Sequence, residues 1–456
     1  MNSNVKKTTG VDMLHGPLFR KIIIFAMPLL ASGILQQSFN AVDVGIVGRF
    51  ASSQAMAAVG SNGSLISIMV SLFLGISIGA NIVIANYIGQ RNHAGIKRAI
   101  STVSFVAVAS GIILLLVGEL FAKPILELMS VPEDVIDLAT LYLKVYFLGM
   151  PFMMIYNFAS AIMRSMGDTK RPFYSLAVAS ALNIILDLVF VKFFDMDVDG
   201  VALATVISNA VNAFLMIYWL TKEPEPYRLN IKAIAVNRSE LKKILQIGIP
   251  AGIQGMVFSF ANIFIQSSIN KFGSAAVAGS AAALTYEVYC YYIVSAFCQA
   301  AVAFLSQNYG AGQYDRCKRV FWLCLVAGMV STGTMNVLIV WQKDFFLNIF
   351  TTDSNVMHYA IIRLQCVLLF QWIATTYEVS GACMRGLGYS MTPTLITIFG
   401  TCVLRLGWVY LAAKYAFDFA RLLQIYPISW VITGGAVMTA YFIVQHRVFS
   451  RKVQPI

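Results

Sequence analysis

Residues 27–48 read MPLLASGILQQSFNAVDVGIVG, an apolar stretch that carries one proline, three amides and one carboxylate. On a helix, Gln36, Asn40 and Asp43 are spaced i, i+4 and i+7, so they share one face while Leu, Ile and Val cover the others. A carboxylate in such a segment is costly unless it has a partner or a cavity. The stretch therefore predicts a membrane helix whose polar face serves a function.

The composition of the whole chain supports a membrane protein. Of its 456 residues 58% are hydrophobic and only 12% are charged, with a mean hydropathy of +0.73, whereas soluble domains are roughly 25% charged. The net charge of +12 comes from Lys and Arg in short loops, where they orient membrane helices. No basic-aromatic tract indicates nucleic-acid binding, and we expect no cleaved signal peptide.

Apolar segments of the length needed to cross a bilayer recur along the chain. They predict an all-α polytopic protein with twelve transmembrane helices. The segments cover approximately residues 18–45, 55–84, 99–122, 138–163, 173–194, 200–221, 244–270, 276–306, 320–342, 357–384, 392–414 and 424–446.

Basic residues are unevenly shared between the two faces. The face that carries both termini holds 23 of the 33 Lys and Arg residues, the other face 7, and 3 fall inside helices. The excess predicts that both termini lie in the cytoplasm and that the protein sits in the cell (inner) membrane. The longest polar connection divides the chain near its middle, so we expect an N-lobe at 1–221, a linker at 222–243 and a C-lobe at 244–456.

The two halves repeat. Offsets of 222 and then 221 superpose proline, asparagine, basic and glycine positions in the same order, which predicts two six-helix lobes of the same orientation, as in transporters with a substrate path between repeats. Pro28 and Pro250 match each other and are candidate hinges. The other matches include Asn40 with Asn262, Gly89 with Gly310, Lys97-Arg98 with Lys318-Arg319, and Met163-Arg164 with Met384-Arg385.

Four acids fall within the predicted spans, namely Asp43, Asp187, Glu287 and Glu378. Such positions are candidates for function. Asn183 and Asp187 are spaced i, i+4 and share a helix face. With Asp43, Asn157 and Thr205 they form a set of two carboxylates and neutral hard oxygen ligands suited to a monovalent cation or a shared proton. Alternatively, Asn157 and Thr205 bind neighbouring helices together.

The second lobe leaves two readings open. Glu378 matches Asn157 in the repeat, and Glu287 lies in a tyrosine-rich run beginning at Tyr286. Either acid could meet a cationic substrate with help from aromatic rings, or could close the lobe through an ion pair with Arg405. The cavity candidates are Gln36, Asn40, Asn262, Tyr286, Glu287 and Glu378.

No sequence signature points to an enzyme. The four histidines are scattered, no glycine loop cradles phosphate, and the seven cysteines lack metal-ligand spacing. We therefore expect no cofactor, and transport driven by an ion gradient. The expected partners are a small organic substrate and membrane lipid, and the expected state is a monomer.

These motifs resemble the multidrug and toxic compound extrusion family of secondary transporters across essentially the whole chain. The resemblance rests on Pro28 with Asp43, Val47-Gly48-Arg49-Phe50, Met163-Arg164-Ser165-Met166-Gly167-Asp168, Asn183 with Asp187, Gly200-Val201-Ala202 with Thr205, and Gln307-Asn308-Tyr309-Gly310-Ala311. It implies two six-helix lobes and export of cationic or amphipathic drugs and toxic organic compounds in exchange for inward H⁺ or Na⁺.

The resemblance also implies where the coupling cation binds. The family's N-lobe site carries over to Asp43, Asn157, Asn183, Asp187 and Thr205, with Na⁺ possible at Asp43, Asn183 and Asp187. This match favours the branch of the DNA-damage-inducible and archaeal members. The vibrio-type branch places a glutamate in the seventh helix, where this chain has Gln254, Phe258, Ser259 and Asn262.

Two rivals to a drug antiporter remain. A lipid-linked sugar flippase of the same superfamily should line its cavity with Arg and Lys, whereas the spans here hold four acids against three bases. A passive channel or a non-transporting receptor would not need the duplicated lobes with hinge prolines.

Overall fold

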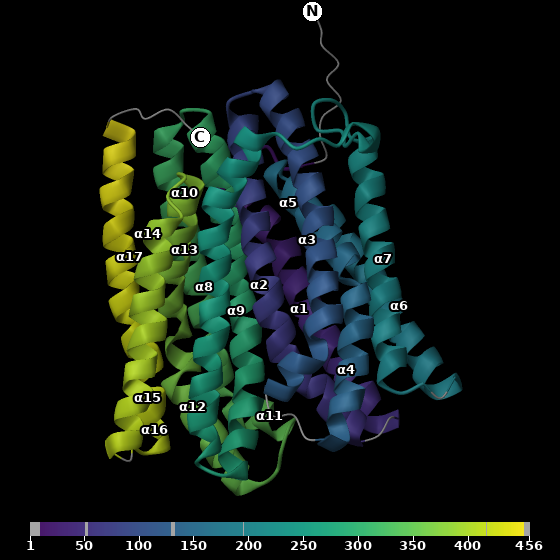
Figure 1. Cartoon of the computed structure of the whole chain (residues 1–456). Helices are drawn as coiled ribbons and strands as arrows, with labels where there is room; N and C mark the ends of the chain where they lie inside the picture. The colour runs from purple at the N-terminus through teal and green to yellow at the C-terminus, as the bar shows by residue number, and fades with distance from the viewer. Residues whose placement is uncertain (1–9, 51–52, 129–132, 195, 416, 451–456) are drawn as a thin grey trace, which may run out of the picture. The chain divides into compact units, whose positions relative to one another are not determined.

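The computed structural model describes residues 10–50, 53–128, 133–194, 196–415 and 417–450. Within these ranges the chain is helices and connecting loops (Figure 1). Eleven helices among the described residues are long and apolar enough to cross a membrane, and a bent pair at Val135–Leu148 and Met150–Ser165 makes twelve if counted as one span. The predicted all-α fold with twelve spans is thus confirmed. The side chains of the Val47-Gly48-Arg49-Phe50 motif lie outside the described residues.

The first half of the chain contains seven helices that account for six spans. The bend of 46° between α4 and α5 lies at Gly149, two residues before Pro151, because proline removes a backbone donor inside the span. The helices are α1 (Leu18–Phe50), α2 (Ser53–Gly89), α3 (His93–Leu128), α4 (Glu133–Leu148), α5 (Met150–Ser165), α6 (Lys170–Phe193) and α7 (Val198–Lys222).

The second half repeats this order with more interruptions. A 3₁₀ segment, η2 (Leu368–Ile373), interrupts the span that matches α4 and α5, and a π-helical segment, η3 (Ile398–Val403), interrupts the span that matches α6. A short 3₁₀ turn, η1 (Ile231–Ala233), lies in the linker. The α-helices are α8 (Arg238–Asn270), α9 (Ser274–Gly310), α10 (Tyr314–Trp341), α11 (Lys343–Asn348), α12 (Ser354–Cys366), α13 (Ala374–Gly386), α14 (Met391–Thr397), α15 (Leu404–Tyr415), α16 (Phe419–Leu423) and α17 (Ile425–Ser450).

The repeated Met-Arg-x-x-Gly motif forms the same helix end in both halves. Gly167 and Gly388 have φ angles of +90° and +91°, which residues other than glycine rarely adopt. The Gly167 amide donates to the Arg164 carbonyl at 3.0 Å and the Gly388 amide to that of Arg385 at 2.8 Å. The motif is therefore repeated because each half needs a left-handed turn after the helix.

Contacts divide the chain into two compact units. The first comprises the segment up to Asp12 and Ala31–Gly252, and the second comprises Met13–Leu30 and the segment from Ile253. Two of the three divisions fall two residues after a helix proline, Pro28 in α1 or Pro250 in α8, and the third lies between Asp12 and Met13, before α1 begins. The first part of α1 therefore groups with the second unit, and the first part of α8 with the first. The predicted lobe boundaries stay a prediction.

Glycines let α8 approach α2 within the first unit. A Cβ on Gly75 would lie 2.1 Å from the Gly252 nitrogen, and one on Gly248 would lie 2.4 Å from the Ile76 Cα. The sequences GISIG at 75–79 and GIPAG at 248–252 both have the G-x-x-x-G spacing that brings membrane helices into backbone contact.

A polar cluster joins the same two helices to each other and to α3. Glu240, only 2% exposed, accepts hydrogen bonds from the Tyr87 hydroxyl at 2.6 Å and from Arg98 Nε at 3.2 Å. Lys243 Nζ donates to the Tyr87 hydroxyl at 2.7 Å. These bonds satisfy groups that would be costly to bury alone.

The segment before α1 and the first part of α1 make contacts in the second unit. The Met13 carbonyl accepts hydrogen bonds from Asn308 Nδ2 and Arg316 Nη2, both at 3.1 Å. Phe25 packs edge to face on Phe304 with ring centroids 5.5 Å apart. Hydrogen bonds thus hold the segment before α1 on α9 and α10, and ring packing holds the first part of α1 on α9.

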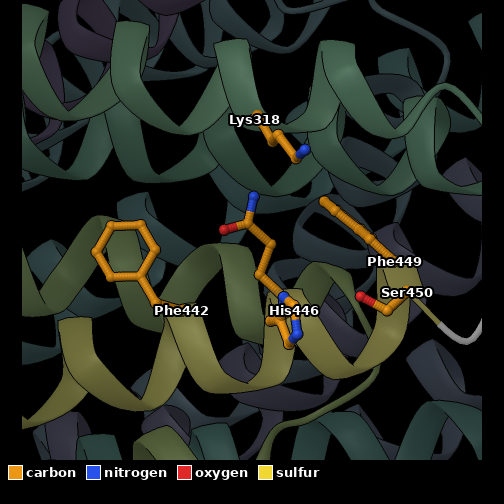
Figure 2. Close-up of a pocket in the computed structure, with 6 residues that line it drawn as sticks. Lys318, Phe442, His446, Phe449 and Ser450 are labelled. Carbon is orange, nitrogen blue, oxygen red and sulfur yellow. The ribbon is translucent and has the colours of Figure 1, made fainter.

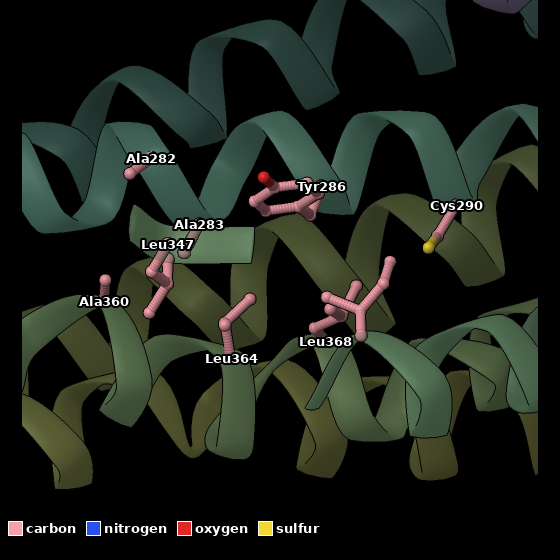
Figure 3. Packing of buried hydrophobic residues seen from close by; sticks show 9 residues of the cluster. Ala282, Ala283, Tyr286, Cys290, Leu347, Ala360, Leu364 and Leu368 are labelled. Carbon is pink, nitrogen blue, oxygen red and sulfur yellow. The ribbon is translucent and has the colours of Figure 1, made fainter. Parts of the chain in front are cut away.

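The second unit has a hydrophobic core where α9 meets α11, α12 and η2 (Figure 3). Small residues on α9, Ala282 and Ala283, face leucines from the other segments. Tyr286 lies in the same cluster, and its hydroxyl donates to the Phe346 carbonyl at 2.7 Å. A buried tyrosine needs such an acceptor, so the ring belongs to the packing of this unit.

Candidate functional site

A cavity of about 140 Å³ opens in the first unit among α1, α4, α5, α6 and α7. Polar side chains from each of these helices line it, together with apolar ones such as Phe39 and Met153. Six of the residues that the sequence singled out are in this lining, namely Gln36, Asn40, Asp43, Asn157, Asn183 and Thr205. The structure therefore brings together groups that lie far apart in the chain.

Helical spacing explains why the polar groups converge. On α1, Gln36, Asn40 and Asp43 follow one face, as predicted from their i, i+4, i+7 spacing. On α6, Ser180 and Asn183 line the cavity, and Asp187 follows one turn later on the same face.

Asp187 lies next to the cavity lining and is fully buried. Its carboxyl group is within hydrogen-bonding reach of the Asp43 carboxyl group. Among the residues that the structure describes, no side chain or backbone group donates a hydrogen bond to either Asp187 oxygen or to Asp43 Oδ1. Two carboxylates this close repel each other. A shared proton or a bound cation would remove that repulsion.

Neutral oxygens surround this pair of acids. Asn157 Nδ2 donates to the Met153 carbonyl at 2.9 Å, and the Thr205 hydroxyl donates to the Val201 carbonyl at 3.0 Å. Both bonds stay within the residue's own helix, and they leave the Asn157 and Thr205 oxygens as acceptors at the cavity. Such oxygens suit a hard cation.

The set is unlike a site for a transition metal. Within the described ranges, no three His, Cys, Asp or Glu side chains are grouped as metal ligands would be. Two carboxylates with amide and hydroxyl oxygens suit a monovalent cation or a proton instead. The coupling role of these five residues stays a prediction.

Sequence reasoning missed several residues that line the cavity. Tyr146 on α4 and Tyr156 on α5 contribute rings and hydroxyls, and Asn209 and Asn212 extend the polar face of α7 beyond Thr205. The i, i+4 and i+7 spacing of Thr205, Asn209 and Asn212 was a signal that could have found the two asparagines. The tyrosines carried no such signal.

Glu287 has a different environment in the second unit. Arg363 Nε donates to Glu287 Oε1 at 2.6 Å and Arg363 Nη2 to Oε2 at 3.0 Å, a bidentate pair in which both side chains are buried. Gln371 Nε2 also donates to the Glu287 carbonyl at 2.9 Å. In this conformation Glu287 closes the unit through an ion pair and is not available to a substrate.

The expected pairing of Arg405 with an acid is wrong. Arg405 Nε donates to the Ser429 hydroxyl at 3.2 Å, and its guanidinium lies 4.4 Å from the centroid of the Tyr426 ring. Arg363 is already in place beside Glu287, while Ser429 and Tyr426 on α17 supply a hydrogen bond and a cation–π contact to Arg405.

Glu378 also lies near an arginine. It accepts a hydrogen bond from the Tyr291 hydroxyl at 3.2 Å, and Arg385 is close enough to interact with it electrostatically. Arg385 Nη2 donates to Gln254 Oε1 at 2.7 Å. The seventh-helix position discussed above thus holds an amide bound to a buried arginine, which disfavours a cation there.

The remaining cavity candidates of the second unit do not join these groups. Tyr286 is part of the hydrophobic core shown in Figure 3, and Asn262 is exposed on α8. Burial of Tyr286 follows from the small residues Ala282 and Ala283 beside it, which leave room for its ring. In this conformation neither Tyr286 nor Asn262 is placed to contact a substrate together with Glu287 or Glu378.

A family model described as MatE matches the chain twice, over residues 28–189 and 250–411. The two matches cover more than half of the chain, and each begins at a helix proline, Pro28 or Pro250. The internal repeat found in the sequence is therefore two copies of one family unit.

Relatives with names match most of the chain, and a solved structure matches nearly all of it. It is 29% identical over 389 residues to the probable multidrug resistance protein YoeA of Bacillus subtilis, over 84% of each chain. It is 26% identical over 400 residues to the probable multidrug resistance protein NorM of Thermotoga maritima, over 87% of this chain and 86% of that one. A crystal structure of MATE in complex with MaL6 matches 98% of this chain and all of its own, with a TM-score of 0.90 at 20% identity, which shows the shared fold.

Proposed function

Because the chain belongs to the MatE family, we propose that it is a secondary antiporter that exports cationic or amphipathic drugs and toxic organic compounds in exchange for inward H⁺ or Na⁺. The relatives named as multidrug resistance proteins support drugs as the substrate class. The charge distribution supports cytoplasmic termini. As a carrier driven by an ion gradient it needs no catalytic residue.

The observation that carries this proposal is the pair Asp43 and Asp187. Their carboxyl groups face each other beside a polar cavity, and three of their oxygens have no donor among the described residues. Buried charges without a partner are costly and mark ion or proton pathways in membrane proteins. The pair therefore suits reversible uptake of the coupling ion.

The acids of the second unit differ from Asp43 and Asp187, and this difference supports ion coupling at the aspartates. Glu287 is paired with Arg363, and Glu378 lies near Arg385. An arginine beside a carboxylate already supplies the positive charge that a coupling cation would bring. We therefore place ion coupling in the first unit alone, which supports the branch of the DNA-damage-inducible and archaeal members.

The energy available from one cation is sufficient for export. One elementary charge that crosses 100 mV releases about 2.3 kcal/mol, and a tenfold concentration ratio costs about 1.4 kcal/mol. One cation per cycle thus sustains a gradient of an uncharged drug somewhat above tenfold. Exchange of one cation for a monovalent drug cation moves no net charge, so the concentration gradient of the coupling ion then supplies the energy. Asp43 and Pro28 lie on the same helix, α1. Ion binding at Asp43 would therefore bend α1 near Pro28, where a backbone hydrogen bond is missing.

The lining of the cavity disfavours the flippase alternative. A carrier of a lipid-linked sugar must meet phosphate charge with Arg or Lys. Among the described residues that line the first-unit cavity there are amides, hydroxyls, apolar side chains and Asp43, and neither Arg nor Lys.

The test is transport by the purified protein in liposomes. Sodium and proton gradients are imposed separately, and export of a fluorescent organic cation is followed for the wild type and for Asp43→Asn. We expect one of the two gradients to drive export. Asp43→Asn should abolish gradient-driven export, because the amide side chain takes up no proton and carries no negative charge to attract a cation.

The matched control is Asp315→Asn. The Asp315 side chain is 92% exposed, so the same chemical change there should leave transport intact. Gradient-driven export by Asp43→Asn at the wild-type rate would contradict the assignment of Asp43. Current without export would favour a channel.

A further inference from the structure

A second hollow, of about 430 Å³, lies in the second unit between the start of α10 and the end of α17 (Figure 2). Figure 2 shows Lys318 on one helix facing Phe442 and Phe449 on the other. The remaining lining is polar, from Gln445, His446 and Ser450. The hollow therefore offers one fixed positive charge, hydrogen-bonding groups and two aromatic rings.

Aromatic packing builds this groove and leaves it open at the helix ends. Phe321 on α10 stacks on Tyr441 of α17 with ring centroids 4.2 Å apart, and Tyr314 packs on Phe449 at 4.9 Å. These contacts fix the distance between the helices on either side of the hollow. The groove is thus part of the packed structure of the unit.

Comparison of the two repeats shows that, among the described residues, Lys318 lacks the close acidic partner that the matching lysine, Lys97, has. Lys97 is the repeat partner of Lys318 and has nearly the same exposure, with 56% against 54% of the side chain accessible. In the first unit Lys97 Nζ contacts Glu225 Oε2 at 2.6 Å. Under the offset of 221 that relates the two lysines, the residue matching Glu225 is His446. The acid that neutralises the first lysine is therefore replaced beside the second.

The acid nearest to Lys318 is a weak substitute. Asp315 Oδ1 lies 3.7 Å from Lys318 Nζ, and the Asp315 side chain is 92% exposed. An exposed ion pair at this distance contributes little binding free energy, so Asp315 neutralises Lys318 only weakly. Arg319 and Arg447, next in sequence to Lys318 and His446, are also exposed. The end of the groove is thus positively charged.

The side chains that continue from the groove along both helices are apolar and exposed. They include Trp322 at 50%, Phe442 at 38% and Ile443 at 65% accessibility. On a spanning helix such residues face acyl chains. By the distribution of Lys and Arg, the groove itself lies at the predicted cytoplasmic end, where anionic lipids attract basic residues.

We propose that this groove binds an anionic phospholipid, with the phosphate held by Lys318, Gln445 and Ser450 and the acyl chains lying along Trp322 and Phe442. A basic pocket between membrane helices is the arrangement that recognises such head groups. The rings exclude a free ion as the preferred ligand, because a phosphate without acyl chains would leave them uncovered. This site is separate from the proposed coupling site and does not depend on it.

The test is lipid binding to the purified full-length protein in detergent. Phosphatidylglycerol and phosphatidylcholine with identical acyl chains are titrated, and native mass spectrometry gives their dissociation constants. We expect tighter binding of phosphatidylglycerol. Lys318→Gln should weaken that binding about fivefold, the factor that corresponds to about 1 kcal/mol per basic residue near an anionic surface. Binding of phosphatidylcholine should not change.

Two further variants make the result specific. His446→Glu restores the charge arrangement of the first unit and should weaken phosphatidylglycerol binding at least as much, with an unchanged melting temperature. Lys97→Gln is the matched control, because it removes the repeat-related lysine on the same predicted face, and it should leave lipid binding unchanged.

Three results would overturn the proposal. One is equal affinity of the wild type for both lipids, and another is an equal loss in Lys97→Gln and Lys318→Gln. The third is displacement of bound phosphatidylglycerol by glycerol phosphate at comparable concentration, which would make the site a soluble-anion site. No transport step enters the measurement, so a failure here leaves the proposed export function untouched.

Discussion

Asp187 and Glu287 are both buried acids within membrane-spanning helices, but their surroundings differ. Glu287 receives two hydrogen bonds from the Arg363 guanidinium, while neither Asp187 oxygen has a donor among the described residues. A paired carboxylate holds its unit together, and an unpaired one is ready to bind a cation or proton. The same residue chemistry thus serves structure in one unit and, by our proposal, coupling in the other.

At this scale we predict that Glu287→Gln destabilises the protein. The change leaves the Arg363 guanidinium buried without its counter-charge, and we expect the free energy of unfolding to fall by about 3–5 kcal/mol. Thermal unfolding of the purified variant measures the loss. The double change Glu287→Met with Arg363→Met removes both charges and should recover most of it. An unchanged melting temperature in Glu287→Gln would contradict the structural role of the pair.

At the scale of elements, glycines bring the backbone of α2 into direct contact with the backbone of the first part of α8. Gly75 and Gly248 have no room for a side chain, since the nearest atoms belong to the facing backbone. Backbones cannot yield as flexible side chains do. Any larger residue must therefore push the two helices apart.

We predict that Gly75→Ala lowers the free energy of unfolding by about 1–3 kcal/mol, the usual cost of overpacking. Gly63→Ala is the control within the same helix, because a Cβ there meets nothing within 4 Å, and the higher helix propensity of alanine should make it neutral or stabilising. Thermal unfolding of both variants checks the difference. Equal melting temperatures would mean that α2 and α8 separate without cost.

At the scale of the whole molecule, two of the three divisions between the units lie beside the two repeat-related prolines. The boundaries at Leu30 and Gly252 follow directly after Pro28 and Pro250. Each of these long helices thus has one part in each unit, with a missing backbone hydrogen bond near the change. This placement supports both prolines as hinges.

We predict that Pro28→Ala slows export severalfold without loss of folded protein, because an unbroken hydrogen-bond ladder stiffens α1 where it must bend. The initial rate at which a fluorescent organic cation is transported across the liposome membrane measures the effect. Pro124→Ala is the control, since Pro124 also lies inside a helix, α3, but away from a unit boundary. Equal rates for Pro28→Ala and Pro124→Ala would argue against a hinge.

Much of the fold could be predicted from local patterns. Apolar length gave the spans, the offset repeat gave the duplication, and the i, i+4, i+7 spacing placed Gln36, Asn40 and Asp43 on one face that does line a cavity. The bend at Gly149 and the interruptions η2 and η3 were not predicted. Hydropathy averages over such breaks, because the residues around them stay apolar.

The sequence by itself determined that this chain crosses the membrane, that it is built from two copies of one unit, and that its spans hold four acids, because apolar length, periodicity and charge are properties of the local sequence. Only the tertiary structure decided the partner of each acid. Arg363, and not Arg405, lies beside Glu287, and the carboxyl groups of Asp187 and Asp43, which the family resemblance had placed in one site, lie within reach of each other. These pairings join residues far apart in the chain, so they depend on how the helices pack.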